Sequence, residues 1–219
     1  MRVTVTITSD FICPWCFIGE RRLEKAIATL PREVQVDLQW RPFELNHDMA
    51  VEGMDRMVYR SAKFGSWEHS QAMDAEVAAV GKVNGIEFAY DRIARTPNTF
   101  AAHRLMWLAG EAGNPTLLAD KLFTAYFTDA FDLSDPEVLK RIGADAGLPA
   151  ARVAAASMTV KVPSRSGSSK WKLTALASGA CHCFASATSS SPARAILLSL
   201  RRRCGPRLPS SRLPPNRGW

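Results

Sequence analysis

The sequence has 219 residues, of which 47% are hydrophobic and 22% are charged, so it can bury the core of one large domain and is not typical of a disordered chain. Its net charge of +7 is uneven, because eleven of the 28 Lys and Arg residues follow residue 157 and all 21 Asp and Glu residues precede residue 146. Residues 1–157 therefore carry seventeen cations against 21 acids, a net charge of −4, which argues against nucleic-acid binding by the main part of the chain.

The first strand is predicted over residues 1–8, where apolar and polar side chains alternate. These residues lack the long apolar run of a secretory signal, and the sequence predicts no membrane span, so we expect a cytoplasmic protein. Five cysteines, two of them spaced as C-x-x-C, suit a catalytic or metal-binding use in a reducing compartment better than a disulfide framework.

A helix is predicted to follow Cys13 and Cys16, because apolar residues at 23, 26, 27 and 30 have helical spacing and Pro31 helps to end the element. Residues 34–40 alternate again and predict a second strand. Residues 1–52 thus form a β-α-β unit with the C-x-x-C where the first strand meets the helix, which is the arrangement of the thioredoxin fold. We therefore expect an α/β protein with a thioredoxin-like core.

Residues 53–157 are predicted to be helices separated by turn signals. The expected helices lie near residues 67–83, 99–112, 116–128, 137–146 and 150–156. Several of them begin close to a proline, which is tolerated in the first helical turn because its missing amide would have no partner there. We interpret residues 53–157 as an all-helical inserted domain.

Cys13 and Cys16 are the predicted catalytic residues. A thiol attacks a disulfide as the thiolate, and the first turn of a helix lowers the pKa of a thiol through unpaired amides and the positive end of the helix dipole. We expect Cys13 to be the nucleophile and Cys16, about one turn further on, to resolve the mixed disulfide. Pro14 would rigidify the turn between them, and Trp15 would add apolar cover.

Other uses of these residues stay open. The C-x-x-C motif is also half of many zinc sites, and residues 181–183, Cys-His-Cys, offer a second half, so a zinc- or nucleic-acid-binding module is one alternative. Zinc pairs usually lie on knuckles or hairpins, whereas this pair is predicted to join a strand to a helix. We therefore expect no bound metal and no bound cofactor, and we expect thiols or disulfides of proteins or small molecules as partners, with neither a membrane nor nucleic acid among them.

Residues 10–19, Asp-Phe-Ile-Cys-Pro-Trp-Cys-Phe-Ile-Gly, resemble the DsbA family of thioredoxin-like proteins, in particular its FrnE-like branch. Residues 40–46, 96–105, 122–127 and 135–139 resemble the same branch, in the same order along the chain. The resemblance implies a thioredoxin core interrupted by a helical domain. It also implies dithiol–disulfide exchange as the activity, with glutathione as one redox partner compatible with it.

The resemblance implies further site residues and an alternative activity. Asn98 and His103 match a family motif that lines the helical side of the active-site groove, and both, together with Phe11, are candidates for substrate contact. A helical His103 that only caps or packs is the competing interpretation. The related 2-hydroxychromene-2-carboxylate isomerases usually carry Ser where Cys13 stands and use glutathione, which makes a glutathione-dependent isomerase the alternative function.

The resemblance ends near residue 157. Family members continue with a Gly-Val-Pro segment, two strands ending in Val-Ser-Gly-Ala and a last helix, none of which occurs in residues 158–219. Suitable codons for residues 179–194, regrouped by one base, encode Gly-Val-Pro and then Val-Ser-Gly-Ala. We therefore interpret residues 158–219 as an out-of-frame, disordered tail that replaces the last strands and helix, and we expect weak activity and low stability.

Overall fold

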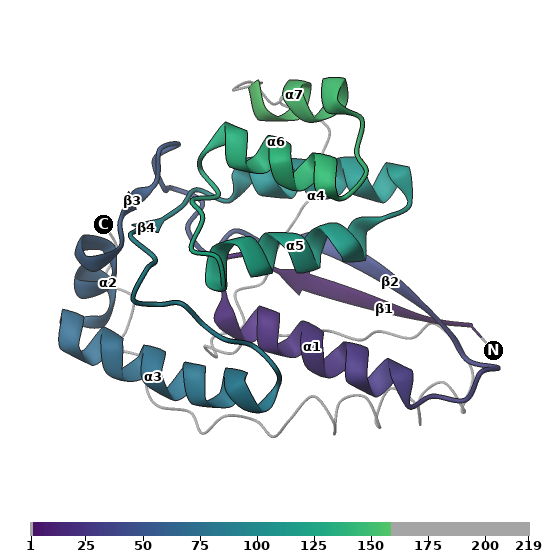
Figure 1. Cartoon of the computed structure of the whole chain (residues 1–219), viewed down its shortest axis with the longest axis horizontal. Helices are drawn as coiled ribbons and strands as arrows, with labels where there is room; N and C mark the ends of the chain where they lie inside the picture. The colour runs from purple at the N-terminus through teal and green to yellow at the C-terminus, as the bar shows by residue number, and fades with distance from the viewer. Residues whose placement is uncertain (1, 159–219) are drawn as a thin grey trace, which may run out of the picture.

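The computed structural model describes residues 2–158, and its N-terminal part is a β-α-β unit (Figure 1). The unit consists of strand β1 (Arg2–Ser9), helix α1 (Pro14–Ala28) and strand β2 (Gln35–Pro42). The two strands pair in parallel, over all eight residues of each. The predicted order of strand, C-x-x-C, helix and strand is therefore confirmed.

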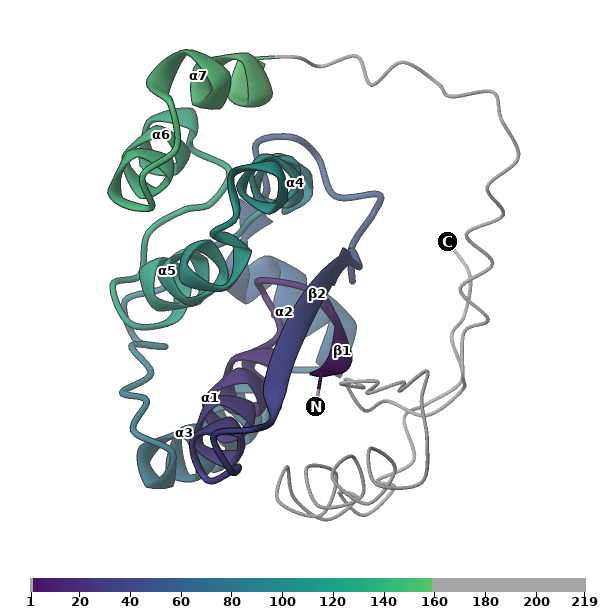
Figure 2. The same ribbon diagram turned by 90° about the vertical axis from the view of Figure 1, so that its right-hand side faces the viewer.

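Helix α1 covers one face of this two-stranded sheet (Figure 2). Every second side chain of β1 is buried, and Val3, Val5 and Ile7 pack against Leu23 and Ala26 of the helix. Burying each of the larger apolar side chains stabilises the fold by roughly 2 kcal/mol relative to leaving it exposed. The alternation seen in the sequence thus gives β1 the apolar face that packs against the C-terminal half of α1.

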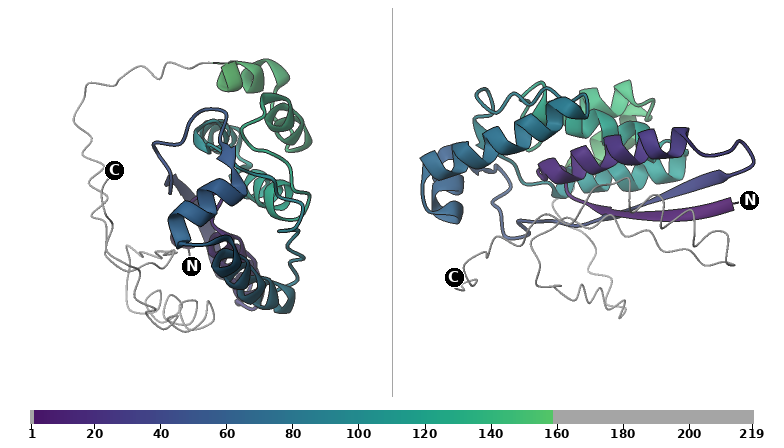
Figure 3. Two further views of the ribbon diagram at one scale, coloured as in Figure 1. Left: turned by 90° about the vertical axis from the view of Figure 1, so that its left-hand side faces the viewer. Right: turned by 90° about the horizontal axis from the view of Figure 1, so that it is seen from below.

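Six helices follow the β-α-β unit within the described residues. They are α2 (Arg56–Phe64), α3 (Trp67–Val83), α4 (Phe100–Ala112), α5 (Pro115–Phe127), α6 (Pro136–Asp145) and α7 (Ala150–Met158). Helices α4 to α7 stack together, whereas α2 and α3 lie by the N-terminal end of α1 (Figures 1 and 3). The five predicted helices are confirmed to within two residues at each end, and α2 was not predicted from the sequence.

The turn signals act as helix caps in two of these helices. The Ser66 hydroxyl accepts a hydrogen bond from the His69 amide at the start of α3. The Asp135 carboxylate accepts one from the Glu137 amide at the start of α6, where Pro136 occupies the first helical position. A side-chain cap of this kind stabilises a helix by about 1 kcal/mol.

The prediction that residues 53–157 are entirely helical is wrong in one detail. Strands β3 (Met54–Asp55) and β4 (Arg95–Thr96) form a short antiparallel pair, and the Arg56 amide donates a hydrogen bond to the Ala94 carbonyl beside it. Two-residue strands are too short for an alternating pattern, and this pair forms because packing brings the two segments together. It fixes the position at which α2 begins.

One apolar core joins the N-terminal unit to the helices. Phe11 packs on Phe123 with a 5.2 Å distance between ring centroids, and Phe17 stacks on Phe123 at 5.3 Å. The buried Cys13 and Cys16 belong to the same core cluster. The cysteine pair therefore lies where the helical segment meets the β-α-β unit.

Residues 159–219, which hold nearly all of the tail interpreted as out of frame, lie outside the described residues. The predicted loss of the last strands and helix falls on these residues and stays a prediction. Within residues 2–158, every helix is too short or too polar to span a bilayer.

Candidate functional site

Cys13 is the N-cap residue of α1. Its amide donates to the Asp10 carbonyl at 3.1 Å, and its own carbonyl accepts the Cys16 amide at 3.0 Å, the first hydrogen bond of the helix. Pro14 occupies the first helical position, as the sequence suggested. The Cys13 side chain therefore starts at the positive end of the helix, where an anion is favoured.

Cys16 lies one turn inside α1 and is only 6% exposed. Burial raises the pKa of its thiol to about 11, and the nearby carboxylates of Asp10 and Glu20 add to the rise, while polar groups of Ser9 and of the Asp10 backbone partly oppose it. Cys16 is a free thiol and so is not bonded to Cys13 in this structure. At neutral pH Cys16 is protonated.

Glu20 is a second buried ionisable group on α1, one turn beyond Cys16. It is 7% exposed, and its Oε2 atom has no hydrogen-bond partner in the described part of the chain. Burial raises the pKa of Glu20 to about 8, with a further contribution from the charge of Asp120 and an opposing one from Arg21. Glu20 is therefore mostly protonated at neutral pH.

Asp10, beside the cysteines, binds a backbone amide and lies close to His103. Its Oδ2 atom accepts the Leu45 amide at 2.6 Å, and its Oδ1 atom lies 3.4 Å from His103 Nε2 without the geometry of a hydrogen bond. His103, on α4, is 8% exposed and packs its ring 5.0 Å from that of Phe11. The packing role expected for a helical His103 is thus observed, and Asp10 binds a loop amide.

Phe11 and His103 do not line the space next to Cys13. Both line a larger hollow of about 750 Å³ that runs along β2 and α4, together with Trp40 and Trp107. Asn98 lines neither hollow: its Nδ2 atom donates to the Met49 carbonyl at 2.7 Å, and its Oδ1 atom accepts the Phe100 amide at 2.9 Å. Substrate contact by these residues stays a prediction.

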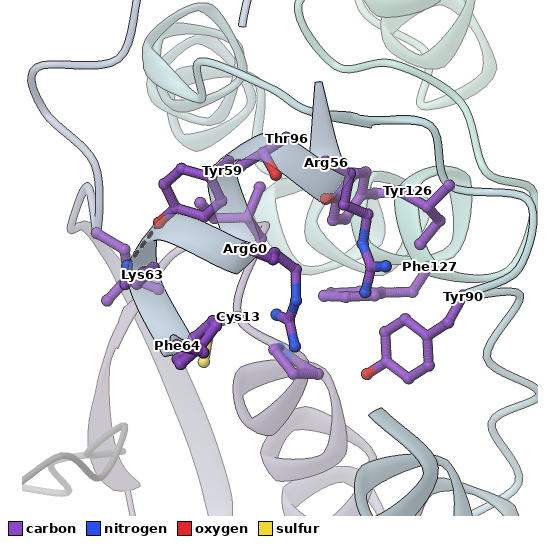
Figure 4. Close-up of a pocket in the computed structure, with 14 residues that line it drawn as sticks. Cys13, Arg56, Tyr59, Arg60, Lys63, Phe64, Tyr90, Thr96, Tyr126 and Phe127 are labelled. Atoms are coloured by element: carbon purple, nitrogen blue, oxygen red, sulfur yellow. Dashed lines mark hydrogen bonds between the residues drawn. The ribbon is translucent and has the colours of Figure 1, made fainter. Parts of the chain in front are cut away.

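The Cys13 side of the site opens into a smaller cavity of about 120 Å³ (Figure 4). Pro14 and Ile12 line it beside the cysteine, whereas Trp15 packs against the core. The opposite walls come from α2 and from the segment around Tyr90. The cavity brings Cys13 together with a helix that lies more than forty residues further along the chain.

The cavity wall contributed by α2 is cationic. Arg56, Arg60 and Lys63 line the cavity, and none of the residues that line it is an Asp or Glu. Asp74 of α3 lies behind them, where it pairs with Arg56 and, at 2.8 Å, with Arg60. One carboxylate thus serves two guanidinium groups.

The sequence analysis missed these cations. Arg56, Arg60 and Lys63 follow helical spacing and share one face of α2 with Tyr59 and Phe64. That spacing is visible in the sequence and is the signal that could have found them. It does not say which part of the molecule the face meets.

The residues described here form no metal site. No group of three or more His, Cys, Asp or Glu side chains within residues 2–158 is arranged to hold a metal ion. The second half of the alternative zinc site, residues 181–183, lies outside the described residues. His47 and His69 are exposed, as surface residues without a motif are expected to be.

Comparison with known proteins assigns the chain to a family. The family model of the DSBA-like thioredoxin domain matches residues 4–165. The chain belongs to this family. The fold is accordingly the thioredoxin-like DsbA fold, an α/β fold with an inserted set of helices, as the sequence predicted.

Solved structures and a curated relative agree with this assignment. A probable DsbA oxidoreductase from Streptomyces coelicolor is 30% identical, with a TM-score of 0.72 over 94% of this chain and 92% of that one. A putative protein disulfide isomerase from Nitrosomonas europaea shares the fold at 14% identity, with a TM-score of 0.53 over 73% of this chain and 72% of its own. The uncharacterised protein YwbO of Bacillus subtilis is 24% identical over 151 residues, which cover 69% of this chain and 70% of YwbO.

Proposed function

We propose that this chain is a dithiol–disulfide oxidoreductase that uses Cys13 and Cys16. The Cys13 thiolate attacks one sulfur of a substrate disulfide, forms a mixed disulfide and releases the first substrate thiolate. Cys16 then loses its proton and attacks Cys13, which closes the Cys13–Cys16 disulfide and releases the second substrate thiolate. The substrate gains two electrons and the enzyme loses two, and the reverse sequence oxidises a substrate dithiol.

The observation that carries this proposal is the position of the two cysteines at the start of α1. Cys13 is the N-cap residue of α1, and it lines a cavity together with three cationic side chains. Both the helix start and these positive charges favour the Cys13 thiolate. Cys16 lies one turn further in, and its pKa of about 11 keeps it a thiol at neutral pH. First attack by Cys16 is thus disfavoured by its protonation. Membership of the DSBA-like family supports the same assignment.

A trapping experiment tests the proposal without requiring turnover. The reduced protein is mixed with hydroxyethyl disulfide, and its products are located by peptide mass spectrometry. We expect the unmodified chain to form the Cys13–Cys16 disulfide, the Cys16→Ser variant to retain the mixed disulfide on Cys13, and the Cys13→Ser variant to form no adduct at Cys16 on the same time scale. Equal trapping on both cysteines, or none on Cys13, would refute the proposal.

Insulin reduction measures whether turnover follows. Since the sequence predicts weak activity for this chain, we expect normal stoichiometric trapping at Cys13 with slow insulin reduction. Turnover at the rate of a reference disulfide oxidoreductase would contradict the predicted loss of activity. The cytoplasmic location and the use of glutathione as a redox partner stay predictions of this proposal.

A further inference from the structure

The cavity beside Cys13 carries more positive charge than its surroundings neutralise. Arg56, Arg60 and Lys63 line it, and of these Arg56 and Arg60 share one carboxylate, that of Asp74. Arg56 is 4% exposed, and its remaining surface packs on the rings of Trp67 and Tyr90 at 5.4 and 5.3 Å. Its charge therefore has little access to water.

Arg60 reaches into the same cavity from the next turn of α2 (Figure 4). Its Nε atom donates to the Ser70 hydroxyl at 2.5 Å and its Nη2 atom to Asp74 at 2.8 Å, which holds the guanidinium in one place. Burial lowers the pKa of Arg60, so its charge is poorly solvated. An anion in the cavity would compensate for that lost solvation.

Lys63 stands at the exposed end of this cationic wall. Its Nζ atom donates to the Tyr59 hydroxyl at 2.5 Å and to Asn46 Oδ1 at 3.2 Å, both of them neutral acceptors. Within residues 2–158 no carboxylate forms an ion pair with it. Lys63 is thus held in position with its charge unneutralised.

We propose that Arg60 and Lys63 bind the carboxylate of a small anionic disulfide and so bring its sulfur to Cys13. Arg56 pairs with the same Asp74 carboxylate as Arg60, so that one negative charge is divided between two guanidinium groups. A cavity of about 120 Å³ admits a chain of a few atoms, so the carboxylate lies only a few bonds from the disulfide. The inference rests on the proposed function and names its substrate class. Small disulfides that carry a carboxylate should react with Cys13 faster than neutral ones, and neutral ones faster than cationic ones.

Alkylation of Cys13 tests the anion site independently of disulfide exchange. Iodoacetate and iodoacetamide have nearly the same shape but differ by one negative charge, so the ratio of their rates at Cys13 reports attraction of an anion. A change in the reactivity of the thiolate itself affects both reagents and cancels in the ratio. Peptide mass spectrometry on the reduced Cys16→Ser protein assigns the adduct to Cys13.

We expect the iodoacetate-to-iodoacetamide ratio at Cys13 to exceed that of dithiothreitol roughly tenfold at low salt, and to fall as salt is added. Arg60→Gln and Lys63→Gln should each lower the ratio several-fold. Lys82→Gln, which removes an exposed charge at the end of α3 away from the cavity, should leave it unchanged. A ratio equal to that of dithiothreitol, or one that falls equally in the Lys82→Gln control, would overturn the inference.

Exchange rates with three disulfides then test the substrate class. Dithiodiglycolate is anionic, hydroxyethyl disulfide is neutral and cystamine is cationic, and each rate is divided by the rate of the same disulfide with dithiothreitol. We expect the normalised rates to fall in that order, and Lys63→Gln to narrow the spread by several-fold. Equal normalised rates refute the substrate class and leave the proposed function standing, whereas no exchange at Cys13 with any of the three refutes both.

Because Arg60 also bonds Ser70 and Asp74, circular dichroism of Arg60→Gln checks its fold, and Lys63→Gln keeps the test decisive if Arg60→Gln unfolds.

Discussion

The two cysteines lie one helical turn apart but have different surroundings. Cys13 opens on the cationic wall of α2, with Arg60 and Lys63, whereas Cys16 lies among carboxyl groups, those of Asp10 and Glu20. The first environment favours a thiolate and the second favours a thiol. The difference teaches that the order of attack in the proposed exchange depends on the surroundings of the pair as much as on its spacing.

The largest loss of stability should come from removing the charge of Asp74, the carboxylate that pairs with Arg56 and Arg60. Asp74→Asn leaves the buried guanidinium of Arg56 and that of Arg60 without their counter-charge. We expect the free energy of unfolding to fall by about 4 kcal/mol, because an uncompensated buried charge remains. Urea denaturation followed by circular dichroism measures the change.

The matched control for that variant is Glu137→Gln, which removes one partner of the exposed pair between Glu137 and Lys140 on α6. An exposed pair contributes little, so the loss should be below about 0.5 kcal/mol. Similar losses in Asp74→Asn and Glu137→Gln would show that the Asp74 cluster is solvated and not buried.

The Glu20→Gln variant tests the raised pKa of Glu20, the buried carboxyl group near Cys16. Its pKa rises from 4.5 in the unfolded chain to about 8 in the folded protein, so the contribution of Glu20 to stability is complete below its unfolded pKa and is lost as the pH rises through about 8. The glutamine variant has no proton to lose. The unfolding free energy of the unmodified chain relative to Glu20→Gln should therefore fall by about 4 kcal/mol between about pH 5 and about pH 9.

Denaturation with urea at both pH values measures this difference. Glu24→Gln, one turn further along α1 with a side chain that is 70% exposed, is the control and should show no such dependence. A pH dependence that persists in Glu20→Gln would place the titrating group elsewhere.

The pKa of the Cys16 thiol can be measured directly. In the Cys13→Ser variant, the labelling of Cys16 by iodoacetamide should rise with pH around a midpoint near the pKa of about 11. At about pH 8 its thiolate fraction should be roughly a hundredfold lower than that of a thiol with the ordinary pKa of 9. The same residue labelled in urea gives the reference curve, and a folded midpoint that coincides with it would remove the contrast between the two cysteines.

The smallest expected effect concerns Asn98, which lines neither the cavity beside Cys13 nor the larger hollow along β2 and α4. Asn98→Ala loses the hydrogen bonds to the Met49 carbonyl and the Phe100 amide, so we expect a loss of about 1 kcal/mol in the free energy of unfolding. The rate of exchange with hydroxyethyl disulfide should stay within about twofold. Asn114→Ala, which removes a side chain without a capping bond, is the control for stability. A tenfold loss of exchange in Asn98→Ala would instead support the substrate contact that the sequence predicted.

Much of the fold could be predicted because its signals are local. The alternation in β1, the apolar spacing of α1 and the caps Ser66 and Asp135 each depend on residues within a few positions of one another. The pair β3 and β4 could not be predicted, because two residues carry no period and about forty residues separate the strands. The helix α2 was missed for a related reason: its nine residues carry a cationic and aromatic face in place of the apolar stripe that predicts a helix.

The sequence by itself determined the local placement of the two cysteines. Cys13 at a helix start and Cys16 one turn on are consequences of local spacing, and the structure places them there. Only the tertiary structure decided what surrounds them. The cations of α2 line the cavity beside Cys13, the Asp74 carboxylate of α3 pairs with two of those cations, and Phe11 and His103 line a different hollow. Charge and burial act through space, and in this fold the groups that control the two sulfurs come from segments far apart in the chain.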